Sequence, residues 1–400
     1  MVYWLGKEGE FMRFYLKQKD YDVAVVEYEK GKIYFEEAID YKRLPFLISY
    51  NQSHKAGFKE WLHYRSIPKT RRNLSEILEA SGVESIEALT IKNLGLSLSD
   101  SYWLCPDNSN IKWHEINLYE NDFCSFPVQQ HSSGSTTFPF RPDSSSNGEL
   151  EKVWEITDGK RILLKESTKP YYQQAYNERF ADILLTELNL PHVQYSVVMR
   201  NDIPYSACSV FTSQDVEYVP AWYLRNVTKK NNSENAYQYF LRAMNTVGVT
   251  ENRSQIDAML AFDFLINNSD RHFGNFGFLR DVNTLEFVSF APLFDHGNSM
   301  WGDALTLDIN RRNQPSKPFR DTFDKQNKLL GMIDLPLKKL TDDFFEQTVQ
   351  KVYSSNSRFD SERLQRLTTE VKRGRDTLLQ LQLRAQKRRD LVLQSSVILK

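Results

Sequence analysis

Residues 265–279 read LINNSDRHFGNFGFL, a stretch that sets Asp270, Arg271, His272 and three Asn residues between apolar flanks. In the preceding segment, apolar residues recur at helical spacing, at Ile256, Met259, Leu260 and Phe264. The residues that follow, Phe276, Phe278 and Leu279, are typical of a strand that enters a core. A surface turn would have a similar composition, but a polar segment held between a core helix and a core strand is a typical place for a functional site.

The spacing of three residues matches kinase-type phosphoryl transfer. Asn275 lies five positions after Asp270, and twenty more positions lead to Asp295 in FAPLFDHGNSMW. In such kinases an Asp orients the accepting hydroxyl, an Asn five residues later holds a metal ion, and a second Asp bridges the metal to the ATP phosphates. The segment between Asn275 and Asp295 predicts two strands joined by a turn, which would bring both side chains to one site. Their oxygen atoms suit Mg²⁺.

A kinase also needs a cation for the phosphates and an acid that positions this cation. Lys165 ends the apolar strand RILLK, and Glu178 follows thirteen residues later in a predicted helix, within reach of the lysine. Each residue also has a structural interpretation, because Lys165 could be a solvated strand end and Asp270 a turn residue. Their joint occurrence in this order favours catalysis. His272 is grouped with Asp270 in the catalytic loop, and we expect it to brace this loop through hydrogen bonds.

Composition limits the other functions. A length of 400 residues predicts two or three domains, and the formal net charge of -1 gives no general attraction to nucleic acid or to an anionic membrane. We therefore do not expect direct contact with nucleic acid. No apolar run is long enough to span a bilayer, and three widely spaced Cys residues predict reduced thiols, neither disulfides nor a zinc site, in a cytoplasmic protein. No Walker or GxGxxG loop is present, which counts against a conventional protein kinase.

The chain divides into three predicted parts. Residues 1–128 would form a binding or regulatory module, residues 136–225 a sheet-based nucleotide lobe, and residues 226–400 a mainly helical lobe. Hairpins are predicted at the EKGK turn of the first part and at Asp158-Gly159 and residues 200–204 of the second. A Ser-, Gly- and Pro-rich segment, residues 129–150, separates the first two parts. The Leu-rich basic tail, residues 361–400, predicts a last helix that packs its Leu face on the body.

These residues resemble the HipA-like kinases, the family named for the bacterial HipA toxin. Members carry Asp-x-His-x-x-Asn, here Asp270, His272 and Asn275, followed by Ala-Pro-x-Tyr/Phe-Asp, here residues 291–295. A strand Lys matches Lys165, and an Asn-Glu pair matches Asn177 and Glu178. The segment SSSNGELEKVW is similar to the family's Ser/Gly-rich loop over the phosphates, which would assign nucleotide contacts to Ser146, Asn147 and Gly148. The resemblance covers about residues 136–360.

The resemblance implies a bilobal protein-kinase-like α+β fold with an additional N-terminal α/β module. It implies ATP and Mg²⁺ as cofactors, a protein Ser or Thr as acceptor, and autophosphorylation at one of Ser144, Ser145 and Ser146. It also implies the toxin of a toxin–antitoxin pair, with an antitoxin as a candidate partner, although the N-terminal third does not match the part of HipA that binds the antitoxin. The DRHxxN form is also similar to phosphoinositide kinases. A lipid kinase and a catalytically inactive binding protein therefore stay open as alternatives.

Overall fold

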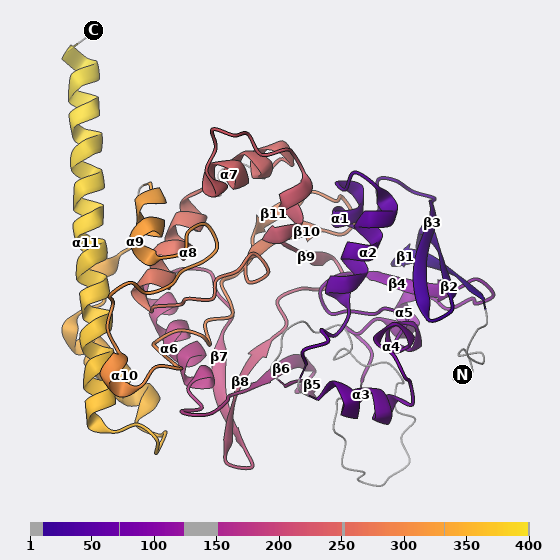
Figure 1. The fold of residues 1–400 in the computed structure, drawn as a ribbon, viewed down its shortest axis with the longest axis horizontal. Helices are drawn as coiled ribbons and strands as arrows, with labels where there is room; N and C mark the ends of the chain where they lie inside the picture. Colours follow the sequence, from indigo (N-terminus) through magenta and orange to yellow (C-terminus); the bar gives the residue numbers. More distant parts are fainter. Residues whose placement is uncertain (1–10, 72, 124–150, 250–252, 332, 399–400) are drawn as a thin grey trace.

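A computed structural model gives the fold of residues 11–71, 73–123, 151–249, 253–331 and 333–398. Within these ranges, the strands form three antiparallel sheets, and the helices lie mainly in other parts of the chain, which is an α+β fold. Figure 1 shows the N-terminal module at one end of the molecule, a central sheet, and the long helix α11 at the opposite end. The predicted α+β class is confirmed.

The N-terminal module is built on one antiparallel sheet with the strand order β3-β2-β1-β4. Its strands are β1 (Met12–Gln18), β2 (Tyr21–Glu29), β3 (Lys32–Ala38) and β4 (Tyr102–Pro106). The helices between and after them are α1 (Phe46–Ser49), α2 (His54–Arg65), α3 (Leu74–Ser81), α4 (Ile86–Lys92) and α5 (Trp113–Ile116). The EKGK turn is confirmed as the β2–β3 hairpin, because Lys30 and Gly31 both adopt the positive φ that a two-residue turn of this kind requires.

The second sheet has the order β5-β6-β8-β7 and carries the lysine of the predicted site. It comprises β5 (Lys152–Thr157), β6 (Lys160–Glu166), β7 (Tyr195–Arg200) and β8 (Ile203–Ser209), with helix α6 (Gln174–Glu187) packed against it. Asp158 and Gly159 adopt positive φ in the β5–β6 turn, which confirms this hairpin. The register of that hairpin places Lys152 directly opposite Lys165.

The third sheet and most of the helices form the rest of the molecule. Strand β9 (Val216–Pro220) pairs with β10 (Gly277–Asp281), which pairs with β11 (Phe287–Phe290). The helices are η2 (Ala221–Asn226), α7 (Ala236–Thr246), α8 (Arg253–Leu265), η3 (Thr306–Asp308), α9 (Phe323–Gln326), η4 (Asn327–Leu329), η5 (Leu337–Lys339), α10 (Asp342–Tyr353) and α11 (Ser361–Ile398). The strand pair predicted between Asn275 and Asp295 is confirmed as β10 and β11.

Helix α8 lies in the centre of the largest hydrophobic core. Every residue from Ile256 to Leu265 is buried, including the acids Asp257 and Asp263. A helix that is buried on all sides needs partners for its charged groups, since an unpaired buried charge is costly. The partner of Asp263 comes from the polar stretch that follows the helix, as described below.

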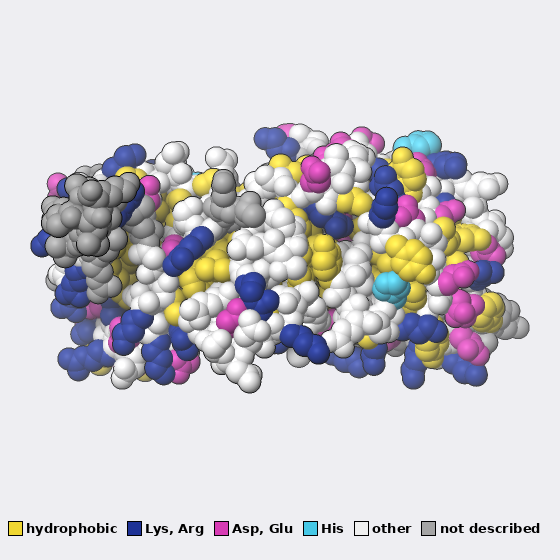
Figure 2. Space-filling view, turned by 90° about the horizontal axis from the view of Figure 1, so that it is seen from above, with side chains coloured by type: hydrophobic (Ala, Val, Ile, Leu, Met, Phe, Trp, Pro, Cys, Tyr) yellow, Lys and Arg dark blue, Asp and Glu magenta, His cyan; other side chains and the backbone are white. Residues whose placement is uncertain are grey.

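Helix α11 runs along the outside of the molecule and projects beyond the body (Figure 1). Leu367, Val371 and Leu378 are completely buried against the core, which confirms the predicted packing of the Leu face. Among the described residues, none of the helices combines the length and the apolar character needed to cross a membrane. On the face drawn in Figure 2, basic and acidic side chains are interspersed with hydrophobic ones, in keeping with the near-zero net charge.

Candidate active site

A buried arginine explains why the polar stretch interrupts the core. Arg271 is 0% exposed and makes a bidentate ion pair with Asp263 of α8. Its Nε donates to Asp263 Oδ2 at 2.9 Å and its Nη2 to Oδ1 at 3.0 Å. Its Nη1 donates to the backbone carbonyls of Asn275 at 2.7 Å and Phe294 at 2.6 Å. One side chain therefore fixes the catalytic loop to the core helix and to the residue that precedes Asp295. This bracing role of Arg271 was not predicted from the sequence.

Hydrogen bonds of two asparagine residues fix the shape of the loop. Asn268 donates from its backbone N to the Asp263 carbonyl at 2.7 Å and from Nδ2 to Asp263 Oδ1 at 2.8 Å. The side chain of Asn275 donates from Nδ2 to the Asp270 carbonyl at 3.3 Å. The carboxylate of Asp263 is thus shared between Asn268 and Arg271, and the turn from Asp270 to Asn275 is closed on itself.

His272 braces the turn through its ring. The backbone N of Gly274 donates to His272 Nδ1 at 3.1 Å, and the backbone N of Asn275 donates to the His272 carbonyl at 2.9 Å. Partial burial lowers the pKa of His272, which favours the neutral ring that this accepting Nδ1 requires. A Cβ on Gly274 would lie only 3.0 Å from the ring, so the absence of a side chain there allows the close approach. The expected hydrogen bonds of His272 are present.

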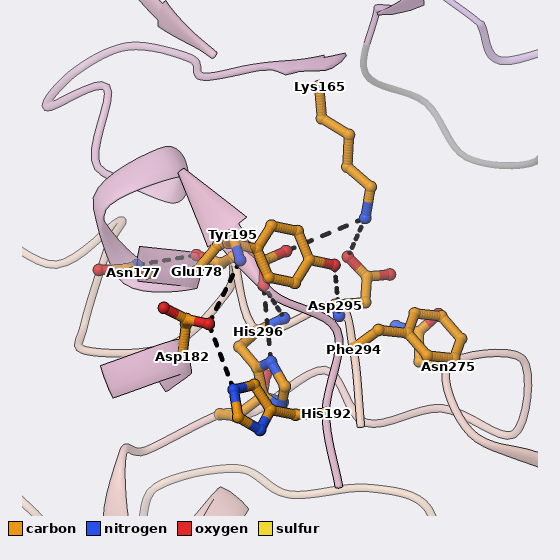
Figure 3. A network of polar contacts seen from close by, with 12 residues as sticks. Lys165, Asn177, Glu178, Asp182, His192, Tyr195, Asn275, Phe294, Asp295 and His296 are labelled. Carbon is orange, nitrogen blue, oxygen red and sulfur yellow. Dashed lines mark hydrogen bonds and ion pairs between the residues drawn. The ribbon is translucent and has the colours of Figure 1, made fainter. Parts of the chain in front are cut away.

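Lys165 and Asp295 form a direct ion pair in the centre of the site (Figure 3). Lys165 Nζ lies 3.0 Å from Asp295 Oδ1 and 3.9 Å from Glu178 Oε1, while its side chain is only 12% exposed. The two residues come from strand β6 and from the segment after β11, and Glu178 comes from α6. Glu178 is therefore within reach of Lys165, as predicted, but the carboxylate of Asp295 is closer to the ammonium.

The charges in this cluster stabilise each other. Burial lowers the pKa of Lys165, but the carboxylates of Asp295 and Glu178 outweigh this effect and raise the pKa above its usual value. Burial likewise raises the pKa of Asp295, but the ammonium groups of Lys165 and Lys152 outweigh it and hold the pKa well below its usual range. Lys165 is therefore a cation and Asp295 an anion at neutral pH, as phosphate and metal binding require.

Asp295 has an unusual backbone. Its φ is 62°, in the left-handed region that a residue with a side chain rarely adopts. Its backbone N donates to the hydroxyl of Tyr195 at 3.3 Å, and Arg271 holds the preceding carbonyl of Phe294. The contacts of Tyr195 and Arg271 on either side of this residue help to hold the conformation.

The acid of the predicted lysine–acid pair is itself held by the segment after Asp295. Glu178 Oε2 accepts from the backbone N of His296 at 2.8 Å. Its neighbour Asn177 donates from Nδ2 to the carbonyls of Gly297 at 2.8 Å and Ser299 at 2.7 Å. Both side chains are buried, so helix α6 positions residues 295–299 through two adjacent residues. The Asn-Glu pair thus positions the Asp295 segment as much as it contacts Lys165.

A cavity of about 340 Å³ contains the polar cluster. Lys152, Lys165, His272, Asn275 and Asp295 all line it. Its apolar walls include Leu163 of β6 and Tyr218 of β9, together with Val193, Phe211 and Phe294 from segments that flank the strands. The cavity thus offers lysine side chains that suit phosphates and apolar side chains that suit a flat aromatic base.

The N-terminal module forms part of the wall of this cavity. Trp61, Tyr64 and Arg65 of α2 line it, together with Asp100 and the buried Tyr102. Arg65 is fixed there by Asp100, whose Oδ2 accepts from Nη1 at 2.5 Å. No motif in the first third of the sequence indicated this contribution, because it depends on how the module packs against the second and third sheets.

The candidate metal ligands fit a magnesium ion that is shared with a phosphate. Asn275 supplies an amide oxygen and Asp295 a carboxylate, and both line the same cavity. Within the described residues, no group of three or more His, Cys, Asp or Glu side chains could hold a metal ion. Mg²⁺ is commonly bound by one or two protein oxygens together with water and substrate phosphates, so two ligands agree with this donor set.

Asp270 lies on the other side of the loop. It lines a second cavity, of about 490 Å³, together with Asn298 and Lys317. The loop of residues 270–275 therefore contributes to both cavities, because Asn275 lines the first and Asp270 lines the second. Ser144, Ser145, Ser146, Asn147 and Gly148, which were predicted to cover the phosphates, lie outside the described residues.

The sequence and the fold were compared with those of known proteins. Residues 145–356, more than half of the chain, match the HipA-like C-terminal domain family. The fold is similar to the Helicobacter pylori proinflammatory kinase CtkA, at 18% identity and a TM-score of 0.46 over 60% of this chain and 96% of that chain. It is also similar to the HipA–HipB toxin–antitoxin complex with operator DNA from Shewanella oneidensis MR-1, at 11% identity and a TM-score of 0.49 over 91% of this chain and 97% of that chain. No curated protein matches the sequence. The family match confirms the resemblance read from the loop residues.

Proposed function

The chain belongs to the HipA-like kinase family, and we propose that it transfers the γ-phosphoryl group of ATP, with Mg²⁺, to the hydroxyl of a protein Ser or Thr. One observation carries this proposal. Lys165 of strand β6 lines one cavity together with Asn275 and Asp295, which lie at the two ends of the distant β10–β11 hairpin. A phosphate-binding cation and two oxygen ligands for a metal are the groups that kinase-type transfer requires in one place.

The two lysines that line the cavity would hold the triphosphate. Lys165 is the first cation, and Lys152, its partner across the β5–β6 hairpin, is the second. We expect Lys165 to exchange Asp295 for the phosphate oxygens when nucleotide binds, because a bound metal ion would then compensate the negative charge of Asp295. Glu178 would keep the ammonium in place during this exchange, since its Oε1 lies 3.9 Å from Lys165 Nζ.

Asn275 and Asp295 would hold Mg²⁺ against the phosphates. The ion would neutralise the charge that develops on the phosphoryl oxygens during transfer. The chain's own residues do the positioning, because Arg271 holds the carbonyls of both Asn275 and Phe294. A single buried guanidinium therefore sets the separation of the two proposed metal ligands.

Asp270 is the proposed base. The acceptor hydroxyl would attack the γ-phosphorus while its proton passes to the Asp270 carboxylate, and the bond between the γ-phosphorus and the bridging oxygen would break to release ADP. Asp270 is suited to this role because it lines the second cavity, where an acceptor could approach it. Nucleotide and acceptor would then approach the loop from opposite sides.

The second cavity favours a protein acceptor over a phosphoinositide. Among the described residues that line it, the charged ones are Asp270, Asp303 and Lys317. Two carboxylates and one ammonium give no net attraction for a headgroup that carries several phosphates, whereas a neutral Ser or Thr side chain meets no such penalty. The lipid-kinase alternative therefore has less support than protein phosphorylation.

Autophosphorylation and a toxin–antitoxin role remain proposals that follow from the family resemblance. The candidate acceptors Ser144, Ser145 and Ser146 precede strand β5, which carries Lys152 into the nucleotide cavity. A phosphate on one of these residues would repel the triphosphate and lower ATP affinity. An antitoxin protein is the corresponding candidate partner.

Labelling with radioactive ATP tests the proposed function. The full chain is incubated with [γ-³²P]ATP and Mg²⁺, alone and with a bacterial lysate, and labelled protein and free phosphate are measured. We expect label on the chain or on lysate proteins, with loss of this label in the variant Asp295→Ala. The ion pair between Lys165 and Asp295 could also stabilise an inactive binding protein. Only a measurement of phosphoryl transfer therefore distinguishes a kinase from such a protein. ATP binding without any transfer would reject the kinase proposal.

A further inference from the structure

Lys317, from a distant part of the chain, forms an ion pair with the proposed base Asp270. Lys317 Nζ donates to Asp270 Oδ1 at 2.6 Å, although the two residues are separated by 47 positions. The other carboxylate oxygen, Oδ2, accepts from Asn298 Nδ2 at 3.1 Å. The Asp270 carboxylate is thus held by two donors, and only one of them carries a charge.

The backbone of Lys317 is held firmly. Gln326, which is 0% exposed, donates from Nε2 to the Lys317 carbonyl at 2.7 Å. The Oε1 atom of the same side chain accepts from the backbone N of Phe319 at 3.2 Å and of Arg320 at 3.3 Å. Phe319 anchors the segment further, because its buried ring packs against Phe240. A buried glutamine therefore presents Lys317 to the catalytic loop from a fixed position.

The side chain of Lys317 remains free to change partner. It is 55% exposed, and the Asp270 side chain is 33% exposed. Exposed ion pairs contribute little to folding stability. The contribution of the Lys317–Asp270 pair to stability therefore does not explain why Gln326 fixes the backbone of this segment. A fixed backbone with a solvent-exposed ammonium is an arrangement that allows contact with a substrate during a reaction.

We propose that the second cavity receives the acceptor hydroxyl and that Lys317 is a catalytic residue on the acceptor side of the transfer; this inference rests on the proposed kinase function. Without substrate, Lys317 neutralises Asp270. When the acceptor O–H takes its place at Asp270 Oδ1, the ammonium moves to an oxygen of the γ-phosphoryl group. The acceptor oxygen bonds to phosphorus, its proton goes to Asp270, and ADP leaves with the electrons of the broken bond.

The lysine would balance charge where the first cavity cannot. Lys165 and the metal ligands approach the phosphates from the nucleotide side, whereas Lys317 lines only the second cavity. During transfer the γ-phosphoryl group moves toward the acceptor, and an ammonium on that side is better placed to stabilise it in the transition state than in the ground state. Such an interaction raises the rate and leaves ATP affinity unchanged.

Lysine variants of the full chain test this role. Lys317→Met keeps the length of the side chain and removes its charge, and Lys317→Arg restores a cation. Lys325→Ala is the matched control, because Lys325 lies in the same segment and pairs with the exposed Asp321 at 2.9 Å. Single-turnover release of label from [γ-³²P]ATP, to water and to the chain, gives the rate, calorimetry with Mg²⁺-ATP gives the affinity, and thermal unfolding reports the fold.

We expect Lys317→Met to slow transfer about 100-fold, the usual effect of removing one group that stabilises transition-state charge, with unchanged ATP affinity and melting temperature. Lys317→Arg should recover most of the rate, and Lys325→Ala should behave as wild type. A wild-type rate in Lys317→Met would overturn the inference, and so would a loss of rate that merely follows a loss of ATP binding. If the wild-type chain transfers no phosphate, the proposed function fails and the inference falls with it.

A second variant tests the cavity itself. Asp303 is exposed and lines the second cavity, so Asp303→Trp should narrow it without disturbing the core. We expect transfer to protein acceptors to fall strongly while hydrolysis of ATP by water continues, because water needs little space. Equal retention of both reactions, or equal loss of both with ATP still bound, would overturn the assignment of this cavity to the acceptor.

Discussion

The ammonium of Lys165 lies 3.0 Å from the carboxylate of Asp295, which is 130 positions further along the chain. The pair joins the end of strand β6 to the segment after β11, so it connects the second sheet to the part of the molecule that contains the catalytic loop. Each residue keeps the other charged in a largely buried site. The ion pair therefore holds two distant segments together and keeps both of its members charged.

Removing Lys165 should weaken nucleotide binding. In Lys165→Met, the carboxylates of Asp295 and Glu178 lose their shared cation and would repel the triphosphate. We expect Mg²⁺-ATP affinity to fall about 10- to 100-fold, the usual worth of one hydrogen bond to a charged group. Calorimetry measures the affinity, with Lys160→Met as the control on the exposed end of the same strand. Equal affinities in both variants would show that Lys165 does not contact the phosphates.

Nucleotide binding should also depend on pH through Lys152. Burial, followed by repulsion from Lys165, lowers the pKa of Lys152 from 10.5 to about 7. In the empty site this lysine is therefore charged below about pH 7 and increasingly neutral above it. The phosphates favour its charged form, so binding above pH 7 takes up a proton, and Mg²⁺-ATP affinity should fall as the pH rises from 7 to 9.

Comparison with Lys152→Met isolates this effect. The variant lacks the titrating group, so its pH profile should contain only the titration of ATP itself. We expect a steeper loss of affinity in the wild type, together with proton uptake that calorimetry detects as a dependence of heat on the buffer. Folding has the opposite pH dependence: between pH 7 and 10.5 the unfolded chain binds the proton more tightly than the folded one, so the unfavourable contribution of Lys152 to stability diminishes as the pH rises. Parallel profiles for both proteins would exclude Lys152 from the phosphate site.

Arg271 should be important for stability as well as for activity. Arg271→Met leaves Asp263 buried and without its counter-charge, and breaking a buried ion pair in this way costs about 3–5 kcal/mol. Urea unfolding should show this loss of stability. The control variant Arg312→Met changes an exposed arginine and should show almost no loss. The double variant Arg271→Met, Asp263→Asn should recover part of the stability, because the unpaired charge is removed. A stable but inactive single variant would place Arg271 in the chemistry alone.

The sequence predicted the parts of the site that depend on short spacing. The run from Asp270 to Asn275, the β10–β11 hairpin and Asp295 were found because local spacing determines where a hairpin places the residues at its ends. The β5–β6 hairpin was found because Asp158 and Gly159 tolerate positive φ. The α+β class followed from the resemblance to the HipA-like kinases.

Contacts between distant segments could not be predicted in this way. Arg271 and Asp263 are only eight positions apart, yet their pairing depends on α8 being enclosed on all sides, which its apolar face alone did not indicate. Trp61 and Arg65 reach the nucleotide cavity because of how two sheets pack together. Lys317 meets Asp270 through a segment whose position depends on the buried Gln326. Each case needs tertiary packing that no local pattern contains.

Asn275 should affect the metal more than the fold. Asn275→Ala removes one proposed Mg²⁺ ligand, so we expect the Mg²⁺ concentration for half-maximal transfer to rise at least several-fold. His272→Ala is the contrasting variant, since it removes the acceptor for Gly274 N and should cost some stability and some activity at an unchanged Mg²⁺ requirement. Titration of Mg²⁺ at saturating ATP measures the difference. The same Mg²⁺ requirement in both variants would remove Asn275 from the metal site.

Asp270 provides the clearest separation of binding from chemistry. Asp270→Asn keeps the size of the side chain but cannot take the acceptor's proton, and a positioned base contributes about 100- to 10,000-fold to a rate. We therefore expect transfer to slow within this range. ATP affinity should stay unchanged, because Asp270 lines the second cavity and the nucleotide would occupy the first. Single-turnover transfer and calorimetry on the same preparation measure the two quantities. If the variant no longer binds ATP, Asp270 belongs to the nucleotide site and its assignment as the base is wrong; if it transfers phosphate at the wild-type rate, the loop does not supply the base at all.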